Sequence, residues 1–238
     1  MTYLSKVIRH LQELETSNTK ELGRRITERL INGGIIQLFG CGHSSLLAQE
    51  PYYRAGGLVP VKPIIIEPLM LHEGPVRSSA YEKTSHYVEN YLEDVDLRKE
   101  DTLIIISTSG RNPAPIDTAL WGKKKGAYVL GILSKAYSIS QPSRHLSGKR
   151  LEDVVDDVID TNIPVGDAIL EEGSTGQPFA PASSVAGIAL LQNLLAEVVT
   201  CYKEFGEEPP IFWSGNLDGV EEHNKRLIEK FEHRINFE

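Results

Sequence analysis

The sequence is poor in cysteine and in positive charge. It contains two cysteines among 238 residues, Cys41 and Cys201, and neither belongs to a CxxC pair. This scarcity argues against a disulfide framework and against a cysteine-rich zinc site. Acidic residues outnumber basic ones by 33 to 25, so the formal net charge is −8. A general nucleic-acid binder needs a basic face, and we therefore expect no nucleic-acid partner.

Long hydrophobic runs are also missing. No apolar run approaches the roughly 18 residues that a membrane span needs. Residues 1–14 have the pattern of an amphipathic helix rather than of a signal peptide. Hydrophobic residues make up 40% and charged residues 24% of the chain, which is typical of a folded soluble protein. We expect a cytoplasmic protein without a membrane partner.

Short β-rich runs alternate with segments of helical periodicity along the chain. Such alternation predicts βαβ units and a parallel sheet between two helical layers, a three-layer α/β/α sandwich. Strands are expected at 35–39, 61–66, 102–106, 128–133 and 154–159. Helices are expected at 3–14, around 26–31, and at 44–55, 78–92, 115–125, 183–202 and 222–231. Long loops are expected at 134–149 and 161–181.

Two of the expected strands end in turns that are rich in hydroxyl groups. The first strand is followed by Gly40-Cys41-Gly42-His43-Ser44-Ser45, and the third by Ser107-Thr108-Ser109-Gly110-Arg111-Asn112. Ligands of open parallel sheets collect at the carboxyl ends of the strands. Glycines let the backbone approach a ligand, and serine hydroxyls and helix N–H groups donate to phosphate oxygens. Helix capping accounts for one of the three hydroxyls at 107–109, so we predict an anion site there. The first turn alone is equally compatible with a tight turn capped by serine.

A dinucleotide site is the main competing interpretation of the first turn. Gly40-x-Gly42 begins the Rossmann fingerprint, and Glu67 lies near the end of the next expected strand. Ser45, however, stands where the third glycine belongs, and the second hydroxyl turn has no role in that scheme. The sequence also lacks a GxxxxGK[ST] phosphate loop.

Together the two turns resemble those of the sugar isomerase (SIS) domain, which occurs in phosphosugar isomerases and in phosphosugar-binding regulators. Further segments resemble a narrower bacterial group, UPF0309, and the resemblance runs from about residue 1 to 235. The segments that carry it are 39–57, 69–72, 109–113, 143–149, 216–219 and 222–224.

The resemblance implies a sheet of about five parallel strands and a homodimer or homotetramer with the site near a subunit interface. It implies one SIS domain over 1–238, with N-terminal helices at 1–34, a core at 35–205 and a C-terminal extension at 206–238. The ligand would be a sugar phosphate, bound without a cofactor. The residues expected to bind it are Gly42, Ser44, Ser45, Ser107, Thr108, Ser109 and Asn112.

Catalytic candidates follow from the chemistry of these isomerases, which move a proton between adjacent sugar carbons and need a base and an acid. The candidates are Glu50, His72, Glu73 and His43. We expect Glu50 to remove the proton and His72 to open the sugar ring or polarise the carbonyl. His145 and His223 lie in polar stretches and are further possible site residues. The candidate metal ligands have no regular spacing, so no metal is expected.

The similarity to phosphoheptose isomerases is distant. Those enzymes carry a Gln-Glu and His set on the last long helix, whereas residues 186–193 contain no histidine, which counts against heptose isomerisation.

Cys41 lies at an expected helix N-terminus, which would lower its pKa. No base is placed beside it, so a structural thiol is the favoured interpretation.

The leading hypothesis for the function is a phosphosugar isomerase or related lyase. The alternatives are a non-catalytic phosphosugar sensor and an interaction subunit with a vestigial pocket.

Overall fold

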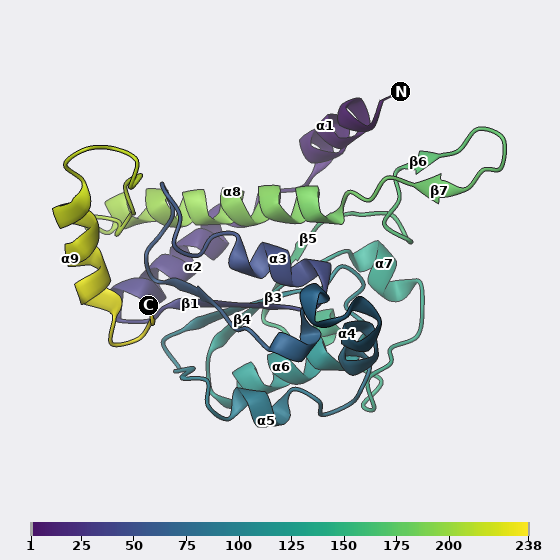
Figure 1. The fold of residues 1–238 in the computed structure, drawn as a ribbon, viewed down its shortest axis with the longest axis horizontal. Helices are drawn as coiled ribbons and strands as arrows, with labels where there is room; N and C mark the ends of the chain where they lie inside the picture. The colour runs from purple at the N-terminus through teal and green to yellow at the C-terminus, as the bar shows by residue number, and fades with distance from the viewer. Residues whose placement is uncertain (1, 238) are drawn as a thin grey trace.

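A five-stranded parallel sheet forms the centre of the computed structural model, which describes residues 2–237 (Figure 1). The strand order is β2-β1-β3-β4-β5. The strands are β1 (Ile36–Gly40), β2 (Val61–Pro63), β3 (Thr102–Ile106), β4 (Tyr128–Leu133) and β5 (Asp157–Asp160). Every residue of β1, β3 and β4 is buried, as expected for strands covered on both faces. The predicted three-layer α/β/α fold is confirmed.

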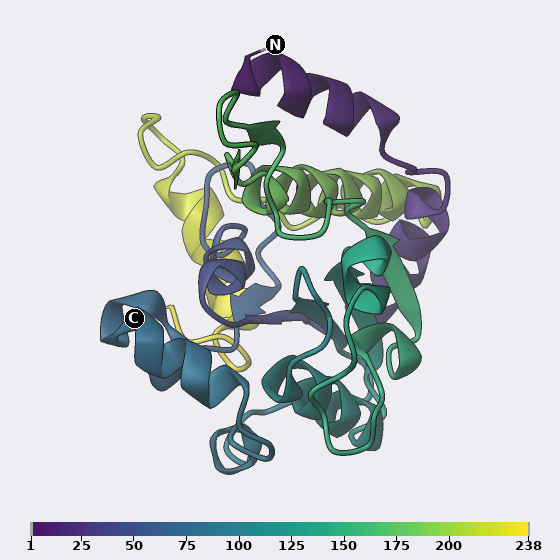
Figure 2. The same ribbon diagram turned by 90° about the vertical axis from the view of Figure 1, so that its right-hand side faces the viewer.

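Helices cover the two faces of the sheet and build two separate hydrophobic cores (Figures 1 and 2). One core joins α2 (Thr19–Ile31), α3 (His43–Gln49) and α8 (Ser183–Glu204) to alternate strand residues such as Ile104 and Ile106. The other joins α5 (Glu89–Leu92) and α6 (Pro113–Lys124) to the intervening residues, such as Leu103 and Ile105. This division follows the period of two along a β-strand.

Several predicted boundaries were wrong, and each has a local cause. The helix expected at 44–55 ends at Gln49, just before Pro51. The helix expected at 78–92 is two helices, α4 (Pro75–Glu82) and α5, separated by a segment in which His86 has a positive φ of 63°.

Two expected loops contain short regular elements. The loop at 134–149 contains α7 (Lys135–Ile139), capped by the Ser134 hydroxyl. The loop at 161–181 contains the hairpin of β6 (Leu170–Glu171) and β7 (Pro178–Phe179). Three short 3₁₀ helices, η1 (Glu67–Leu69), η2 (Leu71–Glu73) and η3 (Leu151–Asp153), complete the connections.

Helix α8 is long and apolar enough to cross a membrane by length and composition, with a mean hydropathy of 1.5. In the structure, Leu190, Leu191, Leu194 and Val198 are buried in the core that α8 shares with α2 and α3. Long apolar helices of globular proteins are commonly buried in the core, and we therefore interpret α8 as a core helix.

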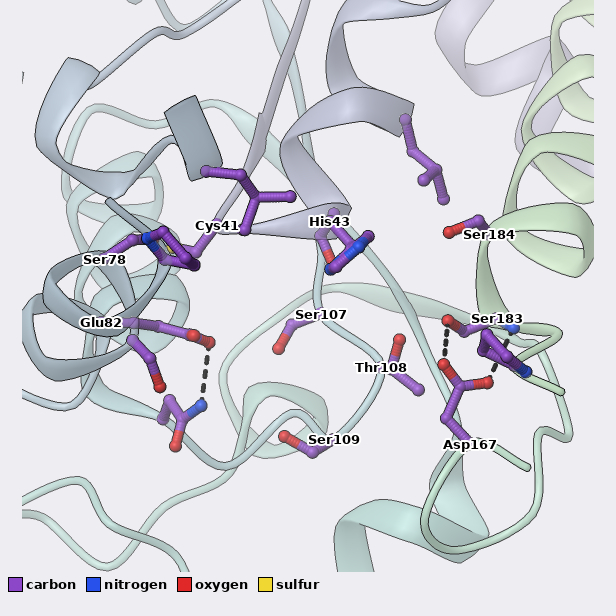
Figure 3. A pocket seen from close by; sticks show the side chains of 18 of the residues that line it. Cys41, His43, Ser78, Glu82, Ser107, Thr108, Ser109, Asp167, Ser183 and Ser184 are labelled. Carbon is purple, nitrogen blue, oxygen red and sulfur yellow. Dashed lines mark hydrogen bonds between the residues drawn. The ribbon is translucent and has the colours of Figure 1, made fainter. Parts of the chain in front are cut away.

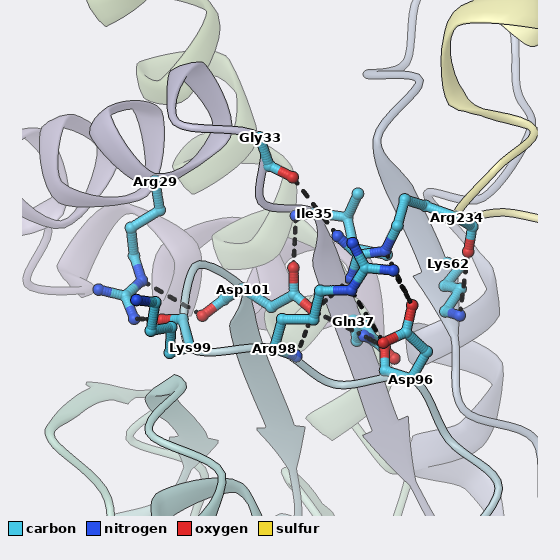
Figure 4. Close-up of polar contacts among 10 residues, drawn as sticks. All are labelled: Arg29, Gly33, Ile35, Gln37, Lys62, Asp96, Arg98, Lys99, Asp101 and Arg234. Carbon is cyan, nitrogen blue, oxygen red and sulfur yellow. Dashed lines mark hydrogen bonds and ion pairs between the residues drawn. The ribbon is translucent and has the colours of Figure 1, made fainter.

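The two ends of the chain add helices at the periphery. Helix α1 (Tyr3–Glu13) lies across α8 near the hairpin, and α9 (Glu221–Phe231) lies at the opposite end of α8 (Figure 1). After α9 the chain returns to the sheet through Arg234, whose guanidinium donates to Asp101 (2.7 Å) and Asp96 (3.1 Å; Figure 4). Asp101 also accepts from the backbone N–H of Ile35 (2.9 Å). This network fastens the C-terminal segment to the end of the sheet opposite the strand carboxyl ends.

Candidate functional site

A cavity of about 510 Å³ opens where the carboxyl ends of β1 and β3 meet the N-terminus of α8 (Figure 3). Its volume suits a small-molecule ligand. Both hydroxyl-rich turns reach it, together with parts of α4 and of the loop before α8. The lining residues are Cys41, Gly42, His43, Ser44, Leu47, Leu71, Pro75, Ser78, Ser79, Glu82, Ser107, Thr108, Ser109, Asn112, Tyr137, Asp167, Pro181, Ser183 and Ser184.

The first turn is compact because two glycines allow it. A Cβ on Gly40 would lie 2.5 Å from the carbonyl oxygen of Ser44, so only glycine fits the approach of strand to helix. Gly42 has a φ of 55°, a conformation that other residues rarely adopt. The turn brings His43 and Ser44 to the cavity. Ser45 is buried instead, and its hydroxyl donates to the carbonyl of Gly42 at 2.8 Å.

The second turn presents its hydroxyls without protein partners. Ser107, Thr108 and Ser109 line the cavity, and their hydroxyls form no hydrogen bond with any group between residues 2 and 237. Ser107 is nevertheless only 5% exposed. By contrast, the Ser78 hydroxyl on the same cavity donates to the carbonyl of Leu69 at 2.7 Å. Buried polar groups are normally paired, so free hydroxyls gathered on one cavity favour a ligand that accepts hydrogen bonds.

Glu82 is a carboxylate of the cavity wall that the sequence did not reveal. It closes α4, and its carboxylate accepts a hydrogen bond from the Asn112 amide at 2.8 Å. The Asn112 carbonyl in turn accepts from Arg144 at 2.9 Å. Burial raises the pKa of Glu82, and the bond from Asn112 opposes this only in part. No local pattern marks Glu82, because only the fold brings α4 beside the 107–109 turn.

Asp167 occupies the far wall, at the start of α8. Its Oδ1 accepts from the backbone N–H groups of Ala182 (3.0 Å) and Ser183 (2.8 Å), and its Oδ2 accepts from the Ser183 hydroxyl (2.6 Å). The neighbouring Ser184 hydroxyl faces the cavity without a partner among the described residues. Asp167 lies in a loop with no recognisable motif, and sequence reasoning missed it.

The Cys41 thiol is buried, and burial raises its pKa well above the ordinary value. The expectation of a lowered pKa at this helix N-terminus was wrong, because desolvation by burial raises the pKa and the nearby Glu82 carboxylate raises it further. A neutral buried thiol agrees with the structural role favoured for it.

Three of the four catalytic candidates do not line the cavity. Glu50 pairs with Arg54 on its own turn and accepts from Gln192 of α8 at 2.6 Å. His72 and Glu73 are exposed, and the His72 ring lies 3.0 Å from Glu67. Within one chain, therefore, Glu50 and His72 do not meet at the Ser107 turn. His43 is the candidate that reaches the cavity.

The two further histidines also lie elsewhere. His145 is nearly buried and pairs with Asp117 of α6 at 2.9 Å. His223 of α9 stacks on Trp213 at 4.1 Å between ring centroids and donates to the carbonyl of Ile211. Among the described residues, Glu67, His72 and Glu73 bring possible metal-ligand atoms within 4.8 Å of one another, all of them exposed. His43 and His223 do not join that group.

Comparison with known proteins assigns the chain to a protein family and identifies structures with a similar fold. The SIS domain family matches residues 1–134, and the chain belongs to it. The structure is similar to that of phosphoheptose isomerase from Neisseria gonorrhoeae, with a TM-score of 0.55 and 16% sequence identity, covering 83% of this chain and 95% of that one. At this identity the likeness concerns the fold.

Within the SIS family the chain belongs to the UPF0309 group. It is 52% identical to a UPF0309 protein of Geobacillus kaustophilus over 98% of this chain and 94% of that protein. A UPF0309 protein of Listeria innocua is 45% identical, over 98% and 96% of the two chains. The resemblance drawn from the motifs is thus confirmed.

Proposed function

We propose that the cavity binds the phosphate of a small sugar phosphate at the 107–109 turn. The observation that carries this proposal is the group of unpartnered hydroxyls on the cavity wall, at Ser44, Ser107, Thr108 and Ser109. A phosphate offers acceptors to several of them at once. The backbone N–H groups of Thr108 and Ser109 form no internal hydrogen bond among the described residues and add two donors. Membership in the SIS family supports the same ligand.

We further propose that the protein is an aldose–ketose isomerase, or a related lyase, that removes a proton beside the sugar carbonyl. Glu82 takes the role first assigned to Glu50. It is one of two carboxylates among the described residues that line the cavity, it is oriented by Asn112, and its raised pKa lies closer to that of an efficient base. His43 lines the same cavity, and we assign it to polarise the carbonyl or to assist ring opening.

The test is exchange of carbon-bound hydrogen. Each sugar phosphate that raises the thermal stability of the protein is incubated in deuterated water, and exchange at C2 is followed by NMR. A ligand at 100 times its dissociation constant adds about 2.7 kcal/mol to the free energy of unfolding, which makes the first screen sensitive. We expect Glu82→Gln to reduce exchange by about 100-fold or more while binding persists.

Glu50→Gln is the matched control, since it removes a carboxylate from outside the cavity. Equal loss in both variants would contradict the assignment of the base to Glu82. If the wild-type protein binds a sugar phosphate and exchanges none of its carbon-bound hydrogen, the isomerase proposal fails and the sensor alternative replaces it.

A further inference from the structure

Asp167 occupies a position that would otherwise attract an anion. Helix α8 has 22 residues, and its first turn faces the cavity with Ser183 and Ser184. The free N–H groups and the dipole at such a terminus favour negative charge. Here both oxygens of Asp167 already accept from Ala182 and Ser183. The protein therefore supplies its own anion at the α8 end of the cavity.

The charges of the residues that line the cavity are mostly of one sign, although Lys83 and Arg144 lie close enough to Glu82 to affect its pKa. Of the lining residues that the structure describes, Glu82 and Asp167 are acidic, none is lysine or arginine, and one is a histidine, His43. Figure 3 shows the Ser107, Thr108 and Ser109 side chains between Glu82 on one side and Asp167 on the other. A ligand whose phosphate sits at this turn extends toward one carboxylate or the other.

The position of Asp167 is held firmly by the surrounding chain. Its φ of 54° lies in the left-handed region, which aspartate tolerates better than most residues, and it follows Gly166, whose φ is 91°. Its loop is joined to α1 by hydrogen bonds from Lys6 to Ile169 (2.8 Å) and from His10 to Thr161 (2.9 Å). A second anion entering the α8 end would have to displace this carboxylate or lie against it.

We propose that Asp167 is a specificity-determining residue that restricts the cavity to sugar monophosphates whose remaining groups are neutral or cationic. This inference rests on the proposed phosphosugar function. Asp167 Oδ2 has accepting capacity beyond its bond from Ser183, so it can receive a hydroxyl or an ammonium group of the ligand. A second phosphate or a sugar carboxylate at the α8 end of the cavity meets the like charge of Asp167, which opposes its binding.

The experiment compares matched ligands by isothermal titration calorimetry. The pairs are fructose 6-phosphate with fructose 1,6-bisphosphate, and glucose 6-phosphate with 6-phosphogluconate; glucosamine 6-phosphate tests the cationic case. We expect the wild-type protein to bind each monophosphate at least about tenfold more tightly than its doubly anionic partner, a difference of about 1.4 kcal/mol. Glucosamine 6-phosphate should bind at least as tightly as glucose 6-phosphate.

Asp167→Asn should reduce the preference to less than about threefold, because the amide keeps an acceptor for α8 but removes the charge. Asp94→Asn is the control, since Asp94 is an exposed aspartate outside the cavity and its loss changes the net charge equally. If Asp167→Asn folds poorly, Asp167→Ser serves as the second variant, and at 0.5 M salt the wild-type preference should shrink.

The outcomes separate the two proposals. Equal affinity of the wild-type protein for monophosphates and bisphosphates, or an unchanged preference in Asp167→Asn, overturns the role of Asp167 and leaves the phosphosugar function standing. If no sugar phosphate of any kind binds, the proposed function fails and this inference falls with it.

Discussion

Individual hydroxyl groups differ in what they do around the cavity, and their hydrogen bonds reveal the difference. Ser45 and Ser78 donate to backbone carbonyls and therefore serve the fold. Ser107 and Ser109 have no partner in the described part of the chain and face the cavity. The same residue type thus stabilises the turn at some positions and remains available to a ligand at others.

This contrast predicts opposite effects of serine substitutions. Ser107→Ala combined with Ser109→Ala should weaken phosphosugar binding by several kcal/mol, at roughly 1.5–3 kcal/mol for each hydrogen bond to a charged group. Thermal stability should barely change, because no internal hydrogen bond is lost. Ser78→Ala, the control, should lower stability by about 0.5–1.5 kcal/mol, since it removes one buried hydrogen bond while the Leu69 carbonyl keeps its bond from the Gly42 N–H. Calorimetry and thermal unfolding measure both effects, and unchanged binding in the double variant would refute the anion site.

Glu82 should make stability depend on pH in a defined direction. Its pKa in the folded protein is raised from an ordinary 4.5, chiefly by burial. A raised carboxyl pKa stabilises the fold at low pH, and this contribution is lost as the pH rises through the folded pKa. Glu82→Gln should therefore raise the melting temperature by a few degrees at pH 8 and have little effect at pH 4. Glu93→Gln, at an exposed glutamate, should show no such difference. A Glu82→Gln variant that is less stable at pH 8 would contradict the direction of the shift.

At the scale of elements, the first turn depends on the absence of a side chain at Gly40. A Cβ there would lie 2.5–2.6 Å from backbone atoms of Ser44, which cannot move without moving the start of α3. Gly40→Ala should lower stability by about 1–3 kcal/mol and weaken phosphosugar binding together. Gly173→Ala is the control, because a Cβ at Gly173 meets no atom within 4 Å. Normal stability and binding in Gly40→Ala, measured by thermal unfolding and calorimetry, would show that the turn adapts.

The elements that the sequence predicted well are those whose signals are local. The bounds of β3 and β4 agree with the prediction because continuous apolar runs are buried on both faces and end at clear polar residues. The break between α4 and α5 was missed because a histidine is only a weak signal for the positive φ that His86 adopts. Glu50 was favoured over Glu82 for a similar reason. It follows the first turn closely along the chain, whereas the proximity of Glu82 to Ser107 arises only from packing.

At the scale of the whole molecule, Arg234 connects the C-terminal segment to the central sheet. Both Arg234 and Asp101 are buried, and their pair is 2.7 Å long. Arg234→Met should lower the free energy of unfolding by about 3–5 kcal/mol, because the buried Asp101 carboxylate loses its ion-pair partner. Asp101→Asn in the same background should recover part of that loss, and denaturant unfolding of both variants measures it. A single variant as stable as the wild type would mean that the C-terminal segment contributes little.

The periphery of the molecule supports the proposed homodimer. The inner face of α1 contacts α8 and the loop before it, and Val7 is buried. Its outer face exposes Leu4 and Ile8, with 65% of Leu4 accessible. Beyond α1, Val76 of α4 is 82% accessible, and α9 has no fully buried residue. Apolar side chains that are exposed in one chain are commonly buried in the interface of a symmetric homodimer.

We predict a homodimer at micromolar concentration, measured by light scattering after size exclusion. A stable interface buries about 800 Å² on each subunit, and α1 with its neighbours offers apolar residues for its centre. Leu4→Glu combined with Ile8→Glu should shift the mass toward the monomer, because two carboxylates would be buried at the interface. Arg9→Glu, an exposed change on the same helix, controls for added charge. A wild-type monomer would refute the dimer, whereas dimers that persist in the double variant would place the interface on another surface, such as that of α4 or α9.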